Sequence, residues 1–161
     1  MVINKKFDKK NFICVLITAF AFILDRISKT KIINQIDNNS IYINDFINLD
    51  LIWNTGVAFG LLSFNSNFIY NLITAIIGFV IILLIYLIIK SIFVEKILFS
   101  LVLGGAAGNF YDRLVYSAVP DFIDIHYQNF HWFTFNMADI FISSGIVILI
   151  IRELLFKNDK K

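Results

Sequence analysis

The chain has 161 residues, of which 58% are hydrophobic and 16% are charged, and its formal net charge is +2. Because soluble domains carry nearer a quarter of their residues as charged side chains, this composition excludes an ordinary soluble domain. The length allows a single membrane domain over residues 1–161, without room for a second soluble domain. We expect no nucleic-acid partner.

Four apolar segments follow one another along the chain. The first is uninterrupted from Phe12 to Leu24, and the second, 68–89, carries no charged residue. The third is uncharged over 97–111, and the fourth, 138–151, has an aspartate near its start. A helix needs about 20 residues to cross a membrane, so only the second segment is long enough unless polar residues enter the spans.

These segments predict an all-α polytopic membrane protein. We place its four transmembrane helices at about 12–33, 68–90, 97–115 and 138–156, and its larger loops at about 34–67 and 116–137. Charged groups inside a membrane span are costly and tend to face a protein interior or a water-filled cavity. The polar residues that extend three of the helices are therefore candidates for a functional site.

The positions of the basic residues orient the helices. They lie in the N-terminal tail, between the second and third segments and at the C-terminal end, namely Lys5, Lys6, Lys9, Lys10, Lys90, Lys96, Arg152, Lys157, Lys160 and Lys161. The two larger loops hold no basic residue and contain Asp37, Asp45, Asp50, Asp121 and Asp124. By the positive-inside rule, both termini are expected in the cytoplasm and both larger loops outside.

The N-terminal region has two alternative interpretations that the residues disfavour. A basic start before 13 apolar residues resembles an export signal, but no small-x-small cleavage site follows. Cys14 could mark a lipoprotein precursor, but residues 11–13 lack the small side chains of such a processing site. Because Cys14 is the only cysteine, it can form no internal disulfide, and we interpret it as an apolar residue of the first helix.

The larger loops contain recognisable patterns. Apolar side chains recur at alternate positions over 41–53, which predicts one strand whose apolar face rests on the membrane interface. Residues 54–56, Asn-Thr-Gly, predict a turn. Residues 122–135 are crowded with aromatic side chains, which is typical of an interfacial aromatic belt.

Polar residues of three predicted helices fall toward the same, outer side of the membrane. They are Asp25 and Lys29 of the first, Asn109, Asp112 and Arg113 of the third, and Asn136 and Asp139 of the fourth. Chance or snorkelling could explain one such group, but three groups at one depth favour a shared polar site. The Asn-x-x-Asp spacing at 109–112 and 136–139 also places each pair on one helical face.

Several of these residues also have structural interpretations. Asn136 and Asp139 could cap the fourth helix, because Asn favours that position and a carboxylate suits the positive end of the helix dipole. Asp112 could form an ion pair with Arg113, which we favour for that pair. Asp121 is harder to explain in this way, because no cation neighbours it in the sequence.

Two further patterns are interpreted as structural. Gly104 and Gly108 have the small-xxx-small spacing that usually serves helix packing. His126 and His131 lie near Asp124, but no metal-site spacing such as H-E-x-x-H is present. We therefore expect no metal site and assign both histidines to the interfacial aromatic region.

Five motifs together resemble one family, the lipoprotein signal peptidases, or bacterial signal peptidase II. They are DRISK at 25–29, NTGVAFG at 54–60, GGAAGNFYDR at 104–113, VPDFID at 119–124 and FNMAD at 135–139. The resemblance implies an aspartyl protease of the bacterial cytoplasmic (inner) membrane that cuts prolipoproteins just before a diacylglyceryl-modified cysteine. It also implies contact with membrane lipids, inhibition by globomycin-type cyclic lipopeptides, and a small extracytoplasmic β-cradle that includes 41–53.

The resemblance makes Asp121 and Asp139 the catalytic pair. The implied substrate-binding and supporting residues are Asp25, Lys29, Asn54, Gly56, Gly108, Asn109, Asp112, Arg113, Asn136 and Ala138. Two carboxylates that share a proton can hydrolyse a peptide without a metal or a Ser/Cys nucleophile, so no cofactor is expected. Asp112 is a poorer candidate, because Arg113 and Asn109 would favour its ionised form.

Two other classes of protein remain as alternatives. A small transporter or channel component would use the aspartates to relay protons or bind cations, and it predicts polar groups through the full membrane depth. In this chain the second segment has only Asn71 and Thr74 near its outer end, and the inner halves of the other segments are almost free of polar residues. A purely structural membrane protein would not require the carboxylates to converge.

Overall fold

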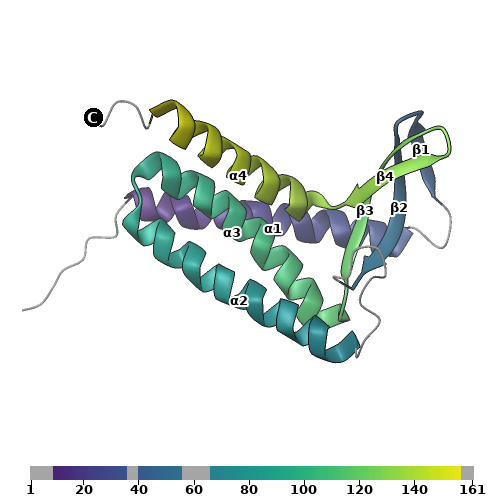
Figure 1. The fold of residues 1–161 in the computed structure, drawn as a ribbon, viewed down its shortest axis with the longest axis horizontal. Helices are drawn as coiled ribbons and strands as arrows, with labels where there is room; N and C mark the ends of the chain where they lie inside the picture. The colour runs from purple at the N-terminus through teal and green to yellow at the C-terminus, as the bar shows by residue number, and fades with distance from the viewer. Residues whose placement is uncertain (1–8, 36–39, 56–65, 157–161) are drawn as a thin grey trace, which may run out of the picture.

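The computed structural model describes residues 9–35, 40–55 and 66–156. The elements in these ranges are α1 (Lys9–Gln35), β1 (Ile41–Asn44), β2 (Ile47–Asn54), α2 (Ser66–Lys90), α3 (Phe93–Tyr116), β3 (Val119–Tyr127), β4 (Phe130–Phe135) and α4 (Met137–Phe156). The helices lie alongside one another, and the sheet projects beyond one end of them (Figure 1). The C-terminal end of α1 and the start of α4 lie at this end of the helices.

The helices are apolar on the outside and partly polar on the inside. Phe79 and Ile82 of α2 are each 66% exposed, whereas Asp25 and Lys29 of α1 are fully buried. Large exposed apolar surfaces are unfavourable in water but suit a lipid environment. Within the described ranges, three helical segments are long and apolar enough to cross a membrane, Lys9–Gln35, Tyr70–Lys90 and Phe93–Tyr116. The chain is therefore a mostly helical, multi-pass membrane protein with a small sheet.

The fourth helix, α4, differs from these three. It is 20 residues long, but it contains Asp139 near its start and Arg152 and Glu153 near its end. Only 12 consecutive residues, 140–151, are uncharged. The fourth membrane crossing therefore stays a prediction.

Small residues allow α1 and α4 to approach α3. A Cβ added at Gly104 would lie 2.6 Å from the Cβ of Ala21 and 2.6 Å from the carbonyl oxygen of Thr18, both in α1. A Cβ at Gly105 would lie 2.6 Å from the carbonyl oxygen of Ala138 in α4. The interpretation of the small-xxx-small spacing as a packing feature is confirmed at Gly104.

Gly104→Ala should destabilise the helix bundle by roughly 1–3 kcal/mol, because the added methyl meets α1 backbone that cannot move without repacking. Gly78→Ala in α2 is the matched control, since its Cβ would meet ring atoms of Phe110 at an ordinary 3.4 Å. The control should be neutral or slightly stabilising, because alanine is the better helix former. Thermal unfolding of both variants in detergent tests this, and equal unfolding temperatures would contradict it.

The sheet is antiparallel, with the strand order β1-β2-β3-β4. The prediction of one strand over 41–53 is wrong, because this region forms a hairpin of β1 and β2. The side-chain oxygen of Asn44 accepts hydrogen bonds from the backbone N–H groups of Phe46 and Ile47, at 2.9 and 3.0 Å. This Asx-type turn reverses the chain where the alternating pattern continues.

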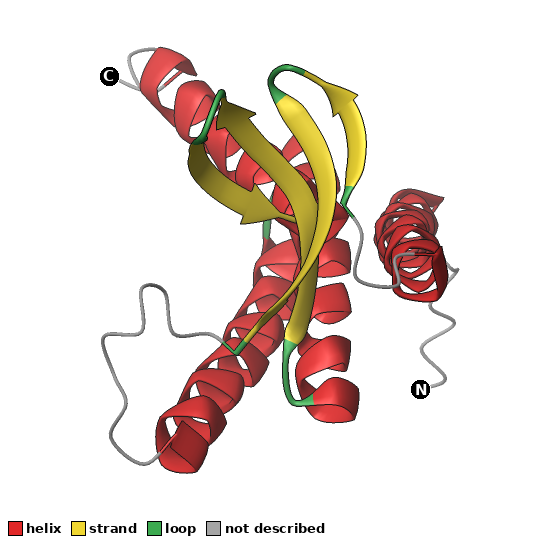
Figure 2. Cartoon of the chain, turned by 90° about the vertical axis from the view of Figure 1, so that its right-hand side faces the viewer, coloured by secondary structure: helices red, strands yellow, loops and turns green. Residues whose placement is uncertain are grey.

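The aromatic region 122–135, which is expected to be an interfacial belt, has a regular secondary structure that the sequence pattern did not predict. It forms most of the β3–β4 hairpin, whose turn contains Gln128 in the left-handed region with φ 53°. Aromatic and β-branched residues favour strands as well as membrane interfaces. The buried pair Phe122 and Ile32 packs β3 against α1, and Figure 2 shows the curved sheet resting at this end of the helices.

Candidate active site

Asp121 lies near the start of β3, a central strand of the sheet, and is only 4% exposed. Both of its carboxylate oxygens accept hydrogen bonds from side-chain amides. Asn54, the last residue of β2, donates to Oδ2 at 2.9 Å, and Asn136 donates to Oδ1 at 2.6 Å. Two strands and the start of α4 therefore position this carboxyl group.

Burial raises the pKa of Asp121 above its ordinary value. The hydrogen bonds from Asn54 and Asn136 act in the opposite direction, and the nearby charge of Asp139 raises the pKa further. Desolvation disfavours the charged form of a carboxyl group, while donated hydrogen bonds favour it. Since desolvation is the largest effect, Asp121 keeps a proton at a higher pH than an exposed aspartate does.

Asp139 is the third residue of α4 and takes part in the cap of that helix. Its Oδ2 accepts a hydrogen bond from the backbone N–H of Asn136 at 3.0 Å, and its own N–H donates to Oδ1 of Asn136 at 3.1 Å. This reciprocal pair is a capping box, so the capping interpretation is confirmed. The other oxygen, Oδ1, accepts from the amide of Asn109 at 2.8 Å, which brings α3 to the same carboxylate.

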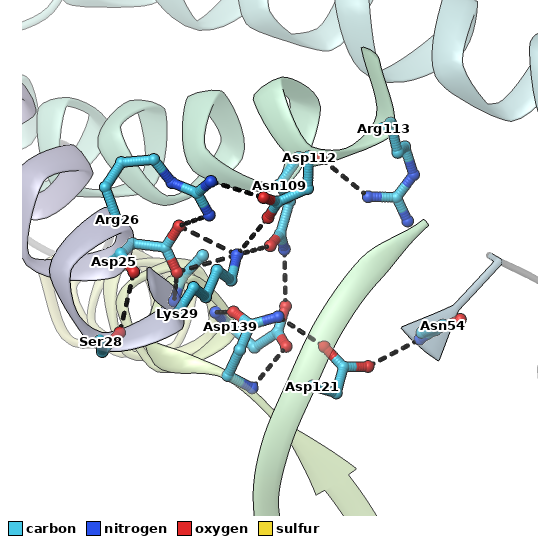
Figure 3. A network of polar contacts seen from close by, with 12 residues as sticks. Asp25, Arg26, Ser28, Lys29, Asn54, Asn109, Asp112, Arg113, Asp121 and Asp139 are labelled. Carbon is cyan, nitrogen blue, oxygen red and sulfur yellow. Dashed lines mark hydrogen bonds and ion pairs between the residues drawn. The ribbon is translucent and has the colours of Figure 1, made fainter. Parts of the chain in front are cut away.

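Asn136 joins the two aspartates. Its side-chain oxygen accepts from the N–H of Asp139, while its amide nitrogen donates to Asp121. The side chain is fully buried and both ends of its amide are used, which fixes its orientation. Asn136 thus connects the carboxyl group of β3 with that of α4, and Figure 3 labels both aspartates.

Beside the aspartates lies a buried cluster of charged side chains, Asp25, Arg26, Lys29 and Asp112. The ammonium group of Lys29 contacts oxygens of three residues, Asp25 at 2.9 Å, Asn109 at 2.8 Å and Asp112 at 2.7 Å. Arg26 bridges Asp25 and Asp112, at 3.1 and 2.6 Å. Because two acids face two bases, their charges compensate.

The favoured ion pair of Asp112 with Arg113 is wrong. Asp112 forms its ion pairs with Lys29 and Arg26 of α1, while Arg113 donates to the backbone carbonyl of Asn109 at 3.2 Å. Neighbouring residues on a helix do not face each other. Asp112 therefore faces α1, whereas the guanidinium of Arg113 does not. Without a direct ion pair in the described part of the chain, the charge of Arg113 still acts on Asp121 and Asp139 as well as on Asp112.

The charged cluster is connected to the aspartates in two ways. Lys29 holds the side-chain oxygen of Asn109, which leaves the amide nitrogen of Asn109 to donate to Asp139. Asp25 accepts a hydrogen bond from the backbone N–H of Ala138 at 3.0 Å and thereby holds the first turn of α4. The cluster therefore acts as a frame that orients the groups around Asp139.

Of the three small residues named by the motifs, the structure describes Gly108 and Ala138 but not Gly56. A Cβ at Gly108 would collide with the carboxylate of Asp25, and Ala138 is fully buried where α4 meets Gly105 of α3. Gly56, the last residue of the predicted turn at 54–56, lies outside the described residues. Close approach of the backbone explains why a small side chain is needed at 108 and 138.

Sequence reasoning missed two residues of this network. Arg26 belongs to the DRISK segment and pairs with Asp112, and its guanidinium also lies over the ring of Tyr111, 4.9 Å from the ring centre. Tyr70 of α2 donates its hydroxyl hydrogen to the backbone carbonyl of Arg113 at 2.6 Å. The position of Arg26 beside Asp25 was an available signal for the first, whereas no local pattern marked Tyr70.

A cavity of about 520 Å³ borders Asp139. Its lining is mostly apolar and comes from β4 and α4, namely Phe133, Phe135, Asp139, Ile140, Ser143, Ser144 and Val147. A second cavity of about 580 Å³ lies between α1, α2 and α3, and its lining includes none of the site residues. The first cavity therefore offers an apolar space beside one of the two carboxyl groups.

Comparison with known proteins gives one consistent result. The profile of the family described as Signal peptidase (SPase) II matches residues 17–155. The lipoprotein signal peptidase of Pelagibacter ubique is 49% identical over 159 residues, which cover 96% of each chain. The lipoprotein signal peptidase of Francisella tularensis subsp. novicida is 47% identical over 123 residues, which cover 74% of this chain and 76% of the relative. A bacterial membrane enzyme solved by the in meso method at 2.3 Å resolution has a TM-score of 0.75 and 33% identity, over 92% of this chain and 91% of that one.

Proposed function

Because the chain belongs to the signal peptidase II family, we propose that this protease is an aspartyl endopeptidase that removes signal peptides from prolipoproteins. The bond cut is the one just before the diacylglyceryl-modified cysteine. A single observation carries the proposal: Asn136 donates hydrogen bonds to both aspartates. Its side-chain amide donates to Asp121, and its backbone N–H donates to Asp139. A pair of carboxyl groups held together is the arrangement that acid–base hydrolysis of a peptide requires.

In the proposed reaction, Asp121 is the acid and Asp139 is the base. Asp139 takes a proton from a water molecule, whose oxygen attacks the scissile carbonyl carbon. Asp121 gives its proton to the carbonyl oxygen, which forms a tetrahedral intermediate with two hydroxyl groups. As the C–N bond breaks, Asp139 gives the proton taken from water to the leaving amine, and one hydroxyl group returns a proton to Asp121. The raised pKa of Asp121 supports its role as the acid, and the donors around Asp139, Asn109 and the N–H of Asn136, complement a negative charge there.

The apolar cavity beside Asp139 supports a lipid-modified substrate. Its aromatic and aliphatic lining can accept an acyl chain or an apolar peptide segment next to the base. The diacylglyceryl group would stay in the surrounding lipid while the peptide bond reaches the carboxyl groups. A globomycin-type cyclic lipopeptide is expected to compete for the same space.

We propose that α4 completes a four-helix membrane domain over residues 1–161, in the bacterial inner membrane with both termini cytoplasmic. The basic residues of the described part support this orientation. Lys96 donates to Asn11 near the start of α1 at 3.2 Å, and Arg152 near the end of α4 pairs with Glu95. These residues lie at the opposite end of the helices from the sheet (Figure 1), as the positive-inside rule requires.

The direct test is cleavage of a lipidated prolipoprotein by the purified protein in detergent. We expect the mature lipoprotein and the free signal peptide as products, and no cleavage of the same precursor without its diacylglyceryl group. A known signal peptidase II, assayed in parallel, controls for the substrate. Absence of cleavage under conditions where that enzyme is active would overturn the proposal and favour a transporter.

Asn54→Ala should shift the alkaline limb of the pH–rate profile to higher pH. The amide of Asn54 lowers the pKa of Asp121, so its removal raises that pKa and Asp121 keeps its catalytic proton at a higher pH. Asn129→Ala, in the exposed β3–β4 turn, is the matched control and should leave the limb in place. The profile of kcat/KM against pH measures this, and a shift of the Asn54→Ala limb to lower pH would exclude Asp121 as the acid.

A further inference from the structure

The two histidines of the chain, His126 and His131, meet one carboxylate on the β3–β4 hairpin. Nδ1 of His131 lies 2.7 Å from Oδ2 of Asp124, and Nδ1 of His126 lies 3.5 Å from the same oxygen. The two rings are stacked with their centroids 5.4 Å apart. One potential ligand atom from each of the three residues lies within 4.8 Å of the others.

The cross-strand pairing explains why these side chains converge. Asp124 and His126 are two positions apart on β3 and so point to the same side of the sheet. His126 is paired with His131 on β4, next to an irregularity in the register at Ile125/His126. His126 is only 7% exposed, and the interfacial place expected for both histidines stays a prediction.

An unused ring nitrogen distinguishes this cluster from a simple hydrogen-bonded pair. Nδ1 of His126 is buried and has no hydrogen-bond partner among the described residues, which is unfavourable for a polar atom removed from water. Asp124 is 3% exposed, whereas the side chain of His131 is 58% exposed. The cluster thus has two buried ligand groups and one at the surface, through which an ion can enter.

We propose that Asp124, His126 and His131 bind a divalent transition-metal ion, with zinc as the best match. Two imidazoles and a carboxylate form a known type of zinc site that leaves a coordination position for water. Calcium and magnesium would need a larger set of oxygen ligands. Zinc–ligand bonds of about 2.0–2.1 Å place the ligand atoms of a tetrahedral site about 3.3 Å apart. The side chains must therefore rearrange around an ion, which the exposed side chain of His131 can do.

A metal at this position would clamp β3 to β4. Asp124 follows Asp121 by three residues on β3, and β4 leads from His131 directly to Asn136 and the start of α4. The ion would therefore hold together the hairpin that carries Asp121 on β3 and that leads, through β4, to Asp139 in the first turn of α4. This role is structural and does not depend on the peptidase reaction.

The test is calorimetric titration of the full-length protein, purified in detergent without a histidine tag, with zinc chloride. We expect one ion per chain, and His126→Ala and His131→Ala should each weaken binding by at least about 10- to 100-fold, the loss typical even of an outer-shell partner. Asp45→Asn, on the exposed β1–β2 turn, is the matched carboxylate control and should bind as the wild type does. Asp121→Asn should also bind normally, which separates this site from the peptidase site.

A second measurement distinguishes the loss of a metal ligand from misfolding of a variant. His131→Cys replaces the exposed ligand by a thiolate, so cobalt added in place of zinc should bind one per chain and show a sulfur-to-cobalt charge-transfer band that the wild type lacks. Absence of stoichiometric zinc binding by the wild-type protein would overturn the proposal. Unchanged affinity in His126→Ala would also overturn it and leave only the hydrogen bond between Asp124 and His131.

Discussion

Asp121→Asn and Asp139→Asn should each reduce the cleavage of a lipidated prolipoprotein by at least about 10³-fold. General acid–base catalysis contributes roughly 10²–10⁴-fold, and two groups that act as a unit are lost together when one is removed. An asparagine at either position can neither accept the proton of the attacking water nor donate one to the carbonyl oxygen. Steady-state cleavage of the same substrate measures the loss.

The surroundings of the two carboxyl groups also predict a change in stability. Both oxygens of Asp121 accept from N–H donors, and so do both oxygens of Asp139. The amide nitrogen of an introduced asparagine would therefore face a donor and lose one hydrogen bond, at a cost of about 1–3 kcal/mol. Each variant should unfold at a lower temperature than the wild type while remaining folded at the assay temperature.

Asp45→Asn is the matched control for this pair of variants. The residue carries the same side chain on the same sheet, but it lies on the exposed β1–β2 turn, where it accepts a hydrogen bond from Tyr42. We expect activity close to that of the wild type. Full activity in a folded Asp121→Asn or Asp139→Asn variant would remove that residue from the mechanism and direct attention to Asp112 or Asp124.

Lys29→Met should lower the free energy of unfolding by about 3–5 kcal/mol. The substitution leaves Asp25 and Asp112 buried with Arg26 as their remaining ion-pair partner. Removal of one partner from a buried ion pair is strongly destabilising because the remaining charge is uncompensated. Unfolding by heat or denaturant in detergent measures the difference.

Two further variants test the origin of this loss. Lys31→Met makes the same change two residues away on α1, where the side chain is exposed, and should alter stability by less than about 0.5 kcal/mol. The double variant Lys29→Met with Asp112→Asn leaves one acid and one base, so it should recover part of the lost stability. If Lys29→Met and Lys31→Met unfold alike, charge compensation in this cluster does not stabilise the fold.

Lys29→Met has an expected effect on catalysis as well. Lys29 holds the side-chain oxygen of Asn109, whose amide nitrogen then faces Asp139. Without the lysine, the amide of Asn109 is free to turn, and the carboxylate can lose a donor. Lys29 is therefore a positioning residue, and its loss should lower kcat more than it raises KM.

The amino-acid sequence by itself determined the long apolar helices and the family. Hydropathy depends on local composition, so the second segment was predicted from its uncharged run, and α2 was found there as Ser66–Lys90. The five motifs lie in a fixed order and led to the family that the profile over residues 17–155 confirms. The Asn-x-x-Asp spacing at 136–139 was also sufficient to predict the helix cap, because capping involves residues three apart.

Only the tertiary structure decided which polar groups meet. Lys29 and Asp112 are 83 positions apart and pair because α1 packs against α3 at its glycines, so the local neighbour Arg113 was the wrong partner to predict. The two hairpins were missed because aromatic residues suit both strands and membrane interfaces. The meeting of Asp124, His126 and His131 likewise depends on the β3–β4 register, since strand pairing joins residues whose spacing in the sequence matches no metal-binding motif.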